Sequence, residues 1–308
     1  MDWNRPMSTF LDPAIKRKSH LVSDALSRDP NGVPLPSVVE VSESGTCNRT
    51  CVFCPRSTPG FPNVKEFIDP AMIESVSRQL GEVGFAGIFL FSGFVEPMMD
   101  KNIYQLVATV RRNLSRGRVE MVTNGDVLNE DRLRRLFDAG LSTLLISVYD
   151  GPEDAERFDG MCRSVGLHED QFVVRRRYLP PEEDFGITLS NRAGMMENAE
   201  FAIPAAEQAV AAPCYYPHYT FFFDYHGDVL MCPHDWGKKR VVGNLLRQSF
   251  MEIWSGIMLE TARRRLQKGD RGFTPCDVCD VKGAMMGERQ VEAWNAYRNQ
   301  NDDGTARP

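Results

Sequence analysis

Short hydrophobic runs alternate with longer amphipathic segments along the first two thirds of the chain. The runs contain many β-branched and aromatic residues, which is typical of strands buried on both faces of a parallel sheet. The pattern predicts strands over residues 37–44, 87–91, 118–124, 143–149 and 171–178, and a sixth strand near 186–190.

The amphipathic segments between these runs predict helices. Asp69 is a suitable N-cap for one helix, with Pro70 at its first position. Asn129 is suited to cap another, which has Glu130 and Asp131 in its first turn. We expect helices over residues 70–84, 102–114 and 130–139, and a short helix after residue 149.

Strands that alternate with helices pair in parallel through right-handed crossovers. About six such units predict an α/β fold with a partial (β/α)6 TIM-like barrel, in which functional groups lie on loops at the C-terminal ends of the strands. The alternation stops after about Ala211, where Cys, aromatic and turn residues gather. We therefore expect an N-terminal extension over 1–35, the barrel over 36–211 and a small C-terminal domain over 212–308.

Composition restricts the class of protein. The 308 residues are 42 % hydrophobic, enough for a sizeable core, yet no apolar stretch approaches the about 20 residues that span a bilayer. The start of the chain lacks the apolar segment of a secretory signal, so we expect a cytoplasmic protein without membrane contact. The net charge of −6 disfavours a general nucleic-acid binder. In the cytoplasm, clustered cysteines indicate metal or redox chemistry rather than disulfides.

Seven of the eight cysteines form two sets. Cys47, Cys51 and Cys54 have the spacing C-x3-C-x2-C on the loop after the first predicted strand. Three thiolates can hold three irons of a four-iron cubane and leave the fourth iron open to an external ligand. A zinc knuckle with a distant fourth ligand is the alternative.

The second set can form a closed site. It consists of Cys214, Cys232, Cys276 and Cys279, the last two in a C-x2-C motif. Four thiolates suit either an iron–sulfur cluster that transfers electrons or a structural zinc ion.

The first set resembles the signature of radical S-adenosylmethionine (SAM) enzymes, with the aromatic Phe53 before the last cysteine. Residues 91–97 resemble the family's glycine–glutamate–proline motif, and residues 123–126 resemble its ribose-contacting segment. The resemblance, together with Arg192 just after the sixth predicted strand, implies SAM contacts from Phe53, Gly93, Glu96, Pro97, Asn124, Ser147 and Arg192.

The second set and the segment around residues 223–232 resemble the SPASM domain in its shortened form, called twitch. No cysteine follows Cys279, which the full SPASM form would require, so the resemblance implies a single auxiliary cluster. The implied cofactors are two 4Fe-4S clusters and SAM. The implied partners are a small-molecule substrate and an external one-electron reductant such as flavodoxin or ferredoxin.

This layout is similar to the twitch dehydrogenases of aminoglycoside biosynthesis. It implies oxidation of a sugar or aminocyclitol hydroxyl to a ketone, with the auxiliary cluster as electron acceptor. The catalytic side chain is not identified by any motif, and Arg192, Asp235 and Cys162 are candidates. Alternatives are an epimerase of a sugar or peptide, a peptide-modifying SPASM enzyme, and an iron–sulfur or zinc protein without catalysis.

Overall fold

The structure, a computed structural model of the chain, describes residues 13–179, 189–196 and 210–302. Its α-helices are α1 (Pro13–Asp24), α2 (Pro70–Glu82), α3 (Ile103–Asn113), α4 (Glu130–Asp138), α5 (Pro152–Ser164), α6 (Tyr216–Tyr219), α7 (Phe250–Trp254), α8 (Ile257–Leu266) and α9 (Glu288–Asp302). Its 3₁₀ helices include η2 (Pro55–Ser57), η3 (Pro97–Met99) and η5 (Cys276–Val278). Its strands are β1 (Val38–Ser42), β2 (Ile88–Phe91), β3 (Arg118–Thr123), β4 (Thr143–Val148), β5 (Phe172–Arg176), β6 (Thr220–Asp224), β7 (Asp228–Leu230) and β8 (Val241–Asn244).

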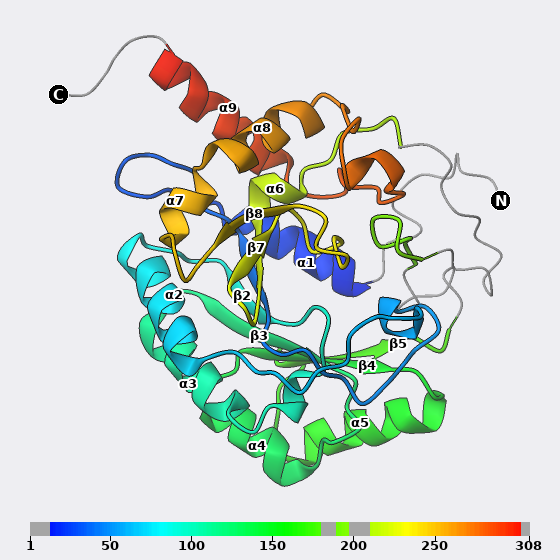
Figure 1. Cartoon of the computed structure of the whole chain (residues 1–308). Helices are drawn as coiled ribbons and strands as arrows, with labels where there is room; N and C mark the ends of the chain where they lie inside the picture. Colours follow the sequence, from blue (N-terminus) through cyan, green and yellow to red (C-terminus); the bar gives the residue numbers. More distant parts are fainter. Residues whose placement is uncertain (1–12, 180–188, 197–209, 303–308) are drawn as a thin grey trace.

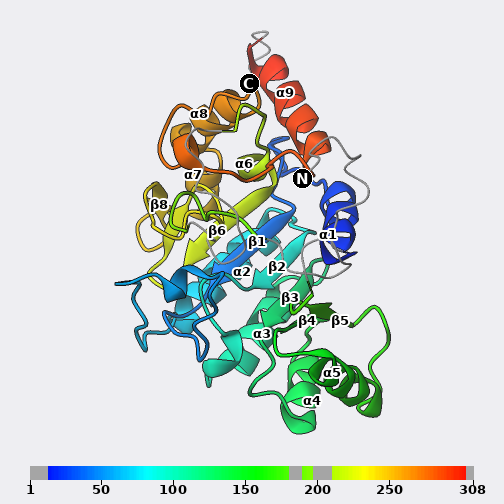
Figure 2. The same cartoon turned by 90° about the vertical axis from the view of Figure 1, so that its right-hand side faces the viewer.

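The eight strands form one sheet in the order β5-β4-β3-β2-β1-β6-β7-β8 (Figures 1 and 2). Strands β1 to β5 pair in parallel, and α2, α3, α4 and α5 make the four crossovers between them. The predicted partial barrel with an α/β fold is confirmed. The helix starts expected at Asp69 and Asn129 are confirmed too, since their side chains accept the N–H groups of Ala71 and Arg132 at 2.9 Å.

The sixth parallel strand comes from the C-terminal part of the chain. Strand β6 pairs in parallel with β1, from Val38 opposite Thr220 to Ser42 opposite Asp224, and β7 and β8 extend the sheet antiparallel. The strand predicted near residues 186–190 lies mostly outside the described residues, and residues 189 and 190 have no regular structure. The cysteine-rich C-terminal segment is therefore continuous with the barrel sheet.

The two faces of the sheet have different coverings. Alternate residues such as Val39 and Phe89 point outward and pack with α2 to α5 in the main core. Their neighbours Val38 and Ile88 point inward and pack against Val22 of α1. The two views together show α1 lying beside the sheet, apart from the outer helices (Figures 1 and 2). The N-terminal helix thus covers part of the barrel's inner face.

Helices α7 to α9 gather at one end of the molecule (Figure 2). Trp254 of α7 and Trp294 of α9 are buried and lie edge to face, with ring centroids 5.8 Å apart. No helix in the described ranges has both the length and the apolar character that crossing a membrane requires.

Candidate active site

The first cysteine set lies on the loop between β1 and η2. The N–H of Cys54 donates to the carbonyl of Cys51 at 2.8 Å, and the N–H of Arg49 donates to Sγ of Cys47 at 3.4 Å. All three thiols are partly exposed and line a cavity of about 280 Å³ at the C-terminal ends of the barrel strands. The sequence predicted this loop on this face of the barrel.

Arg49 fixes this loop to the ends of two strands. Its guanidinium donates to Asp126, after β3, at 2.7 and 2.5 Å, and to Asp150, after β4, at 3.0 and 2.5 Å. The two carboxylates raise the pKa of the Arg49 guanidinium further, and that guanidinium lowers the pKa of the Asp150 carboxyl. Asn48 also donates to Asp126 at 2.6 Å. The loop is therefore held by charge-assisted contacts rather than by regular structure.

Glu96 connects the loop after β2 to the end of β3. Its buried carboxylate accepts the N–H of Met98 at 3.0 Å, the hydroxyl of Thr123 at 2.6 Å and the N–H of Asn124 at 2.6 Å. Burial raises the pKa of the Glu96 carboxyl to about 7, although these three hydrogen bonds oppose the rise. The amide of Asn124 in turn donates to Asn48 at 2.7 Å. Predicted site residues from two strands thus form one hydrogen-bonded unit beside the cysteine loop.

The cavity continues into the barrel. Lys18, Glu40 and Arg175 line both this cavity and a second one of about 180 Å³ that reaches further between the strands. Glu40 projects from β1 and is only 7 % exposed. Burial raises the pKa of its carboxyl, although the charge of Lys18, the hydroxyl of Ser92 and the charge of Arg192 oppose that rise.

Arg192 reaches the same cavity from the segment that follows residue 188. Its backbone has a φ of +47°, and its guanidinium carbon lies 5.4 Å from the ring centroid of Trp236. The neighbouring Asn191 donates from its side-chain amide to the carbonyl of Val278 at 2.6 Å. This places Arg192 between the barrel and the loop that carries Cys279.

The second cysteine set comes together from three places in the sequence. Cys214 precedes α6, Cys232 follows β7, and Cys276 and Cys279 lie at η5. Burial raises the pKa of the Cys276 thiol to about 12, with further contributions from Cys214 and Cys279. Burial likewise raises the pKa of the Cys232 thiol, and the nearby charges of Cys214 and Cys279 raise it further. A Cβ at Gly283 would lie 2.2 Å from Sγ of Cys214, so only glycine leaves this sulfur room.

Residues next to the second set in the sequence line the cavity. Tyr216, Pro233 and His234 line the cavity, and each is within two residues of Cys214 or Cys232. The N–H of His234 donates to Sγ of Cys232 at 3.2 Å, and its Nε2 lies 3.1 Å from the hydroxyl of Tyr216. The first cysteine set therefore lines the cavity directly, and residues next to the second set line it as well.

The spacing of both cysteine sets suits clusters rather than single ions. Sulfur ligands of one tetrahedral zinc ion, each about 2.3 Å from the metal, lie about 3.8 Å apart. Within the described ranges, the one group of three potential ligands whose atoms all lie within 4.8 Å of one another is Asp224, His226 and Asp228. No three cysteine sulfurs of the described ranges all lie that close together, and purely thiolate ligands are the donors that multi-iron clusters take.

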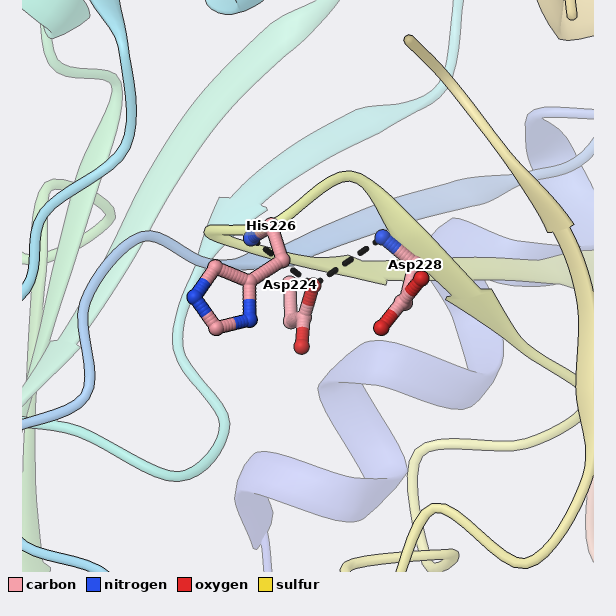
Figure 3. A group of neighbouring side chains, drawn as sticks. All are labelled: Asp224, His226 and Asp228. Carbon is pink, nitrogen blue, oxygen red and sulfur yellow. Dashed lines mark hydrogen bonds between the residues drawn. The ribbon is translucent and has the colours of Figure 1, made fainter. Parts of the chain in front are cut away.

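The group of Asp224, His226 and Asp228 is a hairpin turn between β6 and β7 (Figure 3). One carboxylate oxygen of Asp224 accepts the N–H groups of both His226 and Asp228 at 3.0 Å (Figure 3). Lys238 forms an ion pair with Asp224 and lies 4.0 Å from Asp228. These contacts explain why the two carboxylates lie close together without a metal ion, because Lys238 already supplies the positive charge.

The structure places most of the predicted site residues together. The cavity lining includes Phe53, Gly93, Glu96, Asn124, Ser147 and Arg192. Pro97 is buried as the first residue of η3 and does not line the cavity. Cys162 is in the hydrophobic core, and the carboxylate of Asp235 accepts the N–H groups of Lys239 at 3.0 Å and Arg240 at 2.8 Å.

Sequence reasoning missed the inner part of the cavity. Lys18 and Glu40 belong to no motif, and Arg175 lies within the strand predicted over residues 171–178. The available signal was a charged residue within an otherwise apolar strand, as in the VVEVS segment of β1.

Comparison with known proteins agrees with this site. The model of the radical SAM superfamily matches residues 42–172, and the model of the SPASM iron–sulfur cluster-binding domain matches residues 214–280. The S-adenosyl-L-methionine-dependent 2-deoxy-scyllo-inosamine dehydrogenase of Niallia circulans is 31 % identical over 243 residues, which are 79 % of this chain and 91 % of that protein. The GTP 3′,8-cyclase of Aquifex aeolicus is 28 % identical over 51 % of this chain and 46 % of its own length.

A solved structure is also similar. The crystal structure of BtrN in complex with AdoMet and 2-DOIA superposes with a TM-score of 0.67 at 29 % identity, over 80 % of this chain and 94 % of that one. The fold and the two cysteine sets define a radical SAM enzyme with a SPASM domain. The chain belongs to the family of the S-adenosyl-L-methionine-dependent 2-deoxy-scyllo-inosamine dehydrogenase. Its cofactors are SAM and two iron–sulfur clusters.

Proposed function

We propose that this enzyme oxidises a hydroxyl of a sugar or aminocyclitol to a ketone, with the auxiliary cluster as electron acceptor. The observation that carries the proposal is a cavity that the first cysteine set lines and that also reaches His234, whose N–H donates to Sγ of Cys232 in the second set. Oxidation of a carbinol needs a place for a hydrogen atom, a proton and an electron, and an auxiliary cluster behind the cavity wall can take the electron. The relative from Niallia circulans, a dehydrogenase of 2-deoxy-scyllo-inosamine, supports the substrate class.

The ligand assignments follow from the two sets. We assign Cys47, Cys51 and Cys54 to the cluster that binds SAM. The auxiliary cluster takes Cys214, Cys232, Cys276 and Cys279. When bound together, SAM and the first cluster supply a 5′-deoxyadenosyl radical that can abstract a hydrogen atom from carbon.

The chain's own residues hold and orient SAM in this proposal. Gly93 and Glu96 face its ammonium, Asn124 its ribose and Arg192 its carboxylate, with Phe53 and Ser147 completing the wall. The guanidinium of Arg192 suits a carboxylate because it donates in a planar fork. Pro97 contributes indirectly, because it begins η3 and so sets the direction of Glu96.

We assign Glu40 as the base that accepts the proton of the substrate's hydroxyl. The carboxylate of Glu96 already accepts three hydrogen bonds, whereas Glu40 projects into the inner cavity. A buried carboxylate with a raised pKa is suited to accept a proton near neutral pH. Of the three earlier candidates, Arg192 lines the cavity, and Asp235 and Cys162 do not.

Mass measurement tests the proposal. The anaerobically reconstituted enzyme is incubated with SAM, a reductant such as flavodoxin, and a panel of aminocyclitols, sugars and peptides. We expect a loss of two mass units from an aminocyclitol or sugar, with one 5′-deoxyadenosine per ketone. Deuterium uptake from solvent without that loss would instead indicate an epimerase, and mass change in a peptide would indicate a peptide-modifying enzyme.

The division of the chain into domains is part of the proposal. We place the radical SAM barrel at residues 36–211 and the auxiliary-cluster domain, which contributes β6 to the barrel sheet, at 212–308, after an N-terminal extension over 1–35. The positions of the two matched family models support this division.

A further inference from the structure

Lys18 extends from α1 into the inner part of the cavity. Two contacts fix α1 against the sheet. Val22 packs on the inward-facing Val38 and Ile88 of β1 and β2, and Arg17 donates to the carboxylate of Glu120 at 3.0 and 2.6 Å. The N-terminal segment therefore forms part of the wall of the cavity.

Lys18 has no acceptor among the residues that the structure describes. Its ammonium forms no hydrogen bond or ion pair with any residue of the described ranges, whereas Arg17 beside it is paired with Glu120. The side chain is half-buried, so its ammonium has lost part of its hydration without gaining a protein partner. A ligand with an acidic oxygen would supply that partner.

Glu40 lies near Lys18 without pairing with it. Burial raises the pKa of the Glu40 carboxyl and the charge of Lys18 opposes that rise, but no ion pair joins the two groups, and both line the same cavity. Arg175 and Arg177 belong to the same lining. Two opposite charges that face one cavity without meeting leave room for a ligand that contacts both.

We propose that Lys18 binds an anionic substituent, a phosphate or a carboxylate, on the sugar or aminocyclitol that the enzyme oxidises, while Glu40 contacts its hydroxyl or amine groups. The inference rests on the proposed function and narrows its substrate class to acidic derivatives. An ammonium and an oxyanion form a charge-assisted hydrogen bond, which is about twice as strong as a neutral one. Lys18 is then a specificity-determining residue supplied by the N-terminal helix.

A binding experiment tests the site without turnover. Inorganic phosphate is titrated into the reconstituted enzyme by calorimetry. We expect Lys18→Met to weaken phosphate binding about 10-fold, as for the loss of one hydrogen bond to a charged group. Lys18→Arg, which keeps the charge, should retain most of the affinity. Lys16→Met is the matched control, because Lys16 is on the same helix and exposed to solvent.

A substrate pair tests specificity. Glucosamine 6-phosphate and glucosamine differ only in the phosphate. We expect Lys18→Met to lower kcat/KM for the phosphorylated sugar about 10-fold or more, with little change for glucosamine. An equal loss on both sugars, or phosphate affinity unchanged in Lys18→Met, overturns the inference. If neither sugar is oxidised, the phosphate titration still decides the role of Lys18, and the failure belongs to the proposed reaction.

Discussion

Arg49, two residues after the first cysteine, donates two hydrogen bonds to the carboxylate of Asp126, three residues beyond the end of β3. This contact joins residues that are far apart in the sequence. It ties the cysteine loop to the strand whose end carries Asn124, a proposed SAM contact. The position of the loop is therefore set by the barrel and not by the loop itself.

Loss of the contact between Arg49 and Asp126 should weaken binding of the first cluster. We expect Arg49→Ala to cost about 1.5–3 kcal/mol of local stability, because Asp126 and Asp150 lose their charged donor and only Asn48 still donates to Asp126. Iron content should fall toward that of a single cluster, with loss of SAM cleavage. Arg78→Ala, which breaks an exposed ion pair with Glu82 on α2, should leave both unchanged. Full iron content in Arg49→Ala would contradict the anchoring role.

The two cysteine sets should have separable effects. Cys51→Ala should abolish SAM cleavage, because the first cluster loses a ligand. Cys276→Ala should spare some SAM cleavage while stopping ketone formation, because the electron acceptor is lost. Iron analysis and quantification of 5′-deoxyadenosine check both. Cys162→Ala is the control, because this thiol projects from α5 into the hydrophobic core. The iron content of this variant should match that of the unmodified enzyme. Unchanged SAM cleavage in Cys51→Ala would refute the ligand assignment.

Glu96 should make stability depend on pH. Its folded pKa of about 7 exceeds the ordinary value of 4.5. Between these two values the folded state holds more protons than the unfolded state, so the free energy of unfolding falls as pH rises. The change should reach at most about 3 kcal/mol.

Urea unfolding of the cluster-free protein between pH 4.5 and 8 measures this effect. Glu96→Gln should flatten the dependence in that window, because the amide does not titrate. Glu82→Gln, at the end of α2, serves as the control. A Glu96→Gln profile as steep as that of the unmodified protein would show that another group is responsible.

Arg263 should stabilise the C-terminal helices. It is fully buried, with its guanidinium carbon 4.2 Å from the Trp254 ring centroid and 3.8 Å from that of Trp294. It also donates to the carbonyls of Pro217 at 2.8 Å and Trp254 at 2.9 Å. Arg263→Met leaves both carbonyls without this donor and should cost about 2–4 kcal/mol in the free energy of unfolding.

Denaturant unfolding monitored by tryptophan fluorescence checks this prediction. Arg264→Met is the matched control, because Arg264 is the next residue on α8 and is exposed, in an ion pair with Glu260. It should change stability by less than about 0.5 kcal/mol. Equal losses in the two variants would argue against a special role for the buried arginine.

Much of the barrel could be predicted because its signals are local. The strand before Cys47 and the helix caps at Asp69 and Asn129 depend on hydrophobic runs and on single polar side chains next to them. Strand β6 could not be assigned to the barrel in this way. Its partner β1 lies about 180 residues earlier, and pairing at that separation leaves no periodic signal in either segment.

The sequence by itself determined the chemistry of this protein, because seven cysteines at fixed spacing and an aromatic at residue 53 specify which donors are present and how many. The tertiary structure alone decided which charges line the cavity. Lys18, Glu40 and Arg175 come from a helix and two separate strands, and no spacing in the sequence connects them. Ligand type is a property of side chains, whereas the shape and charge of a cavity arise only when distant segments pack against one another.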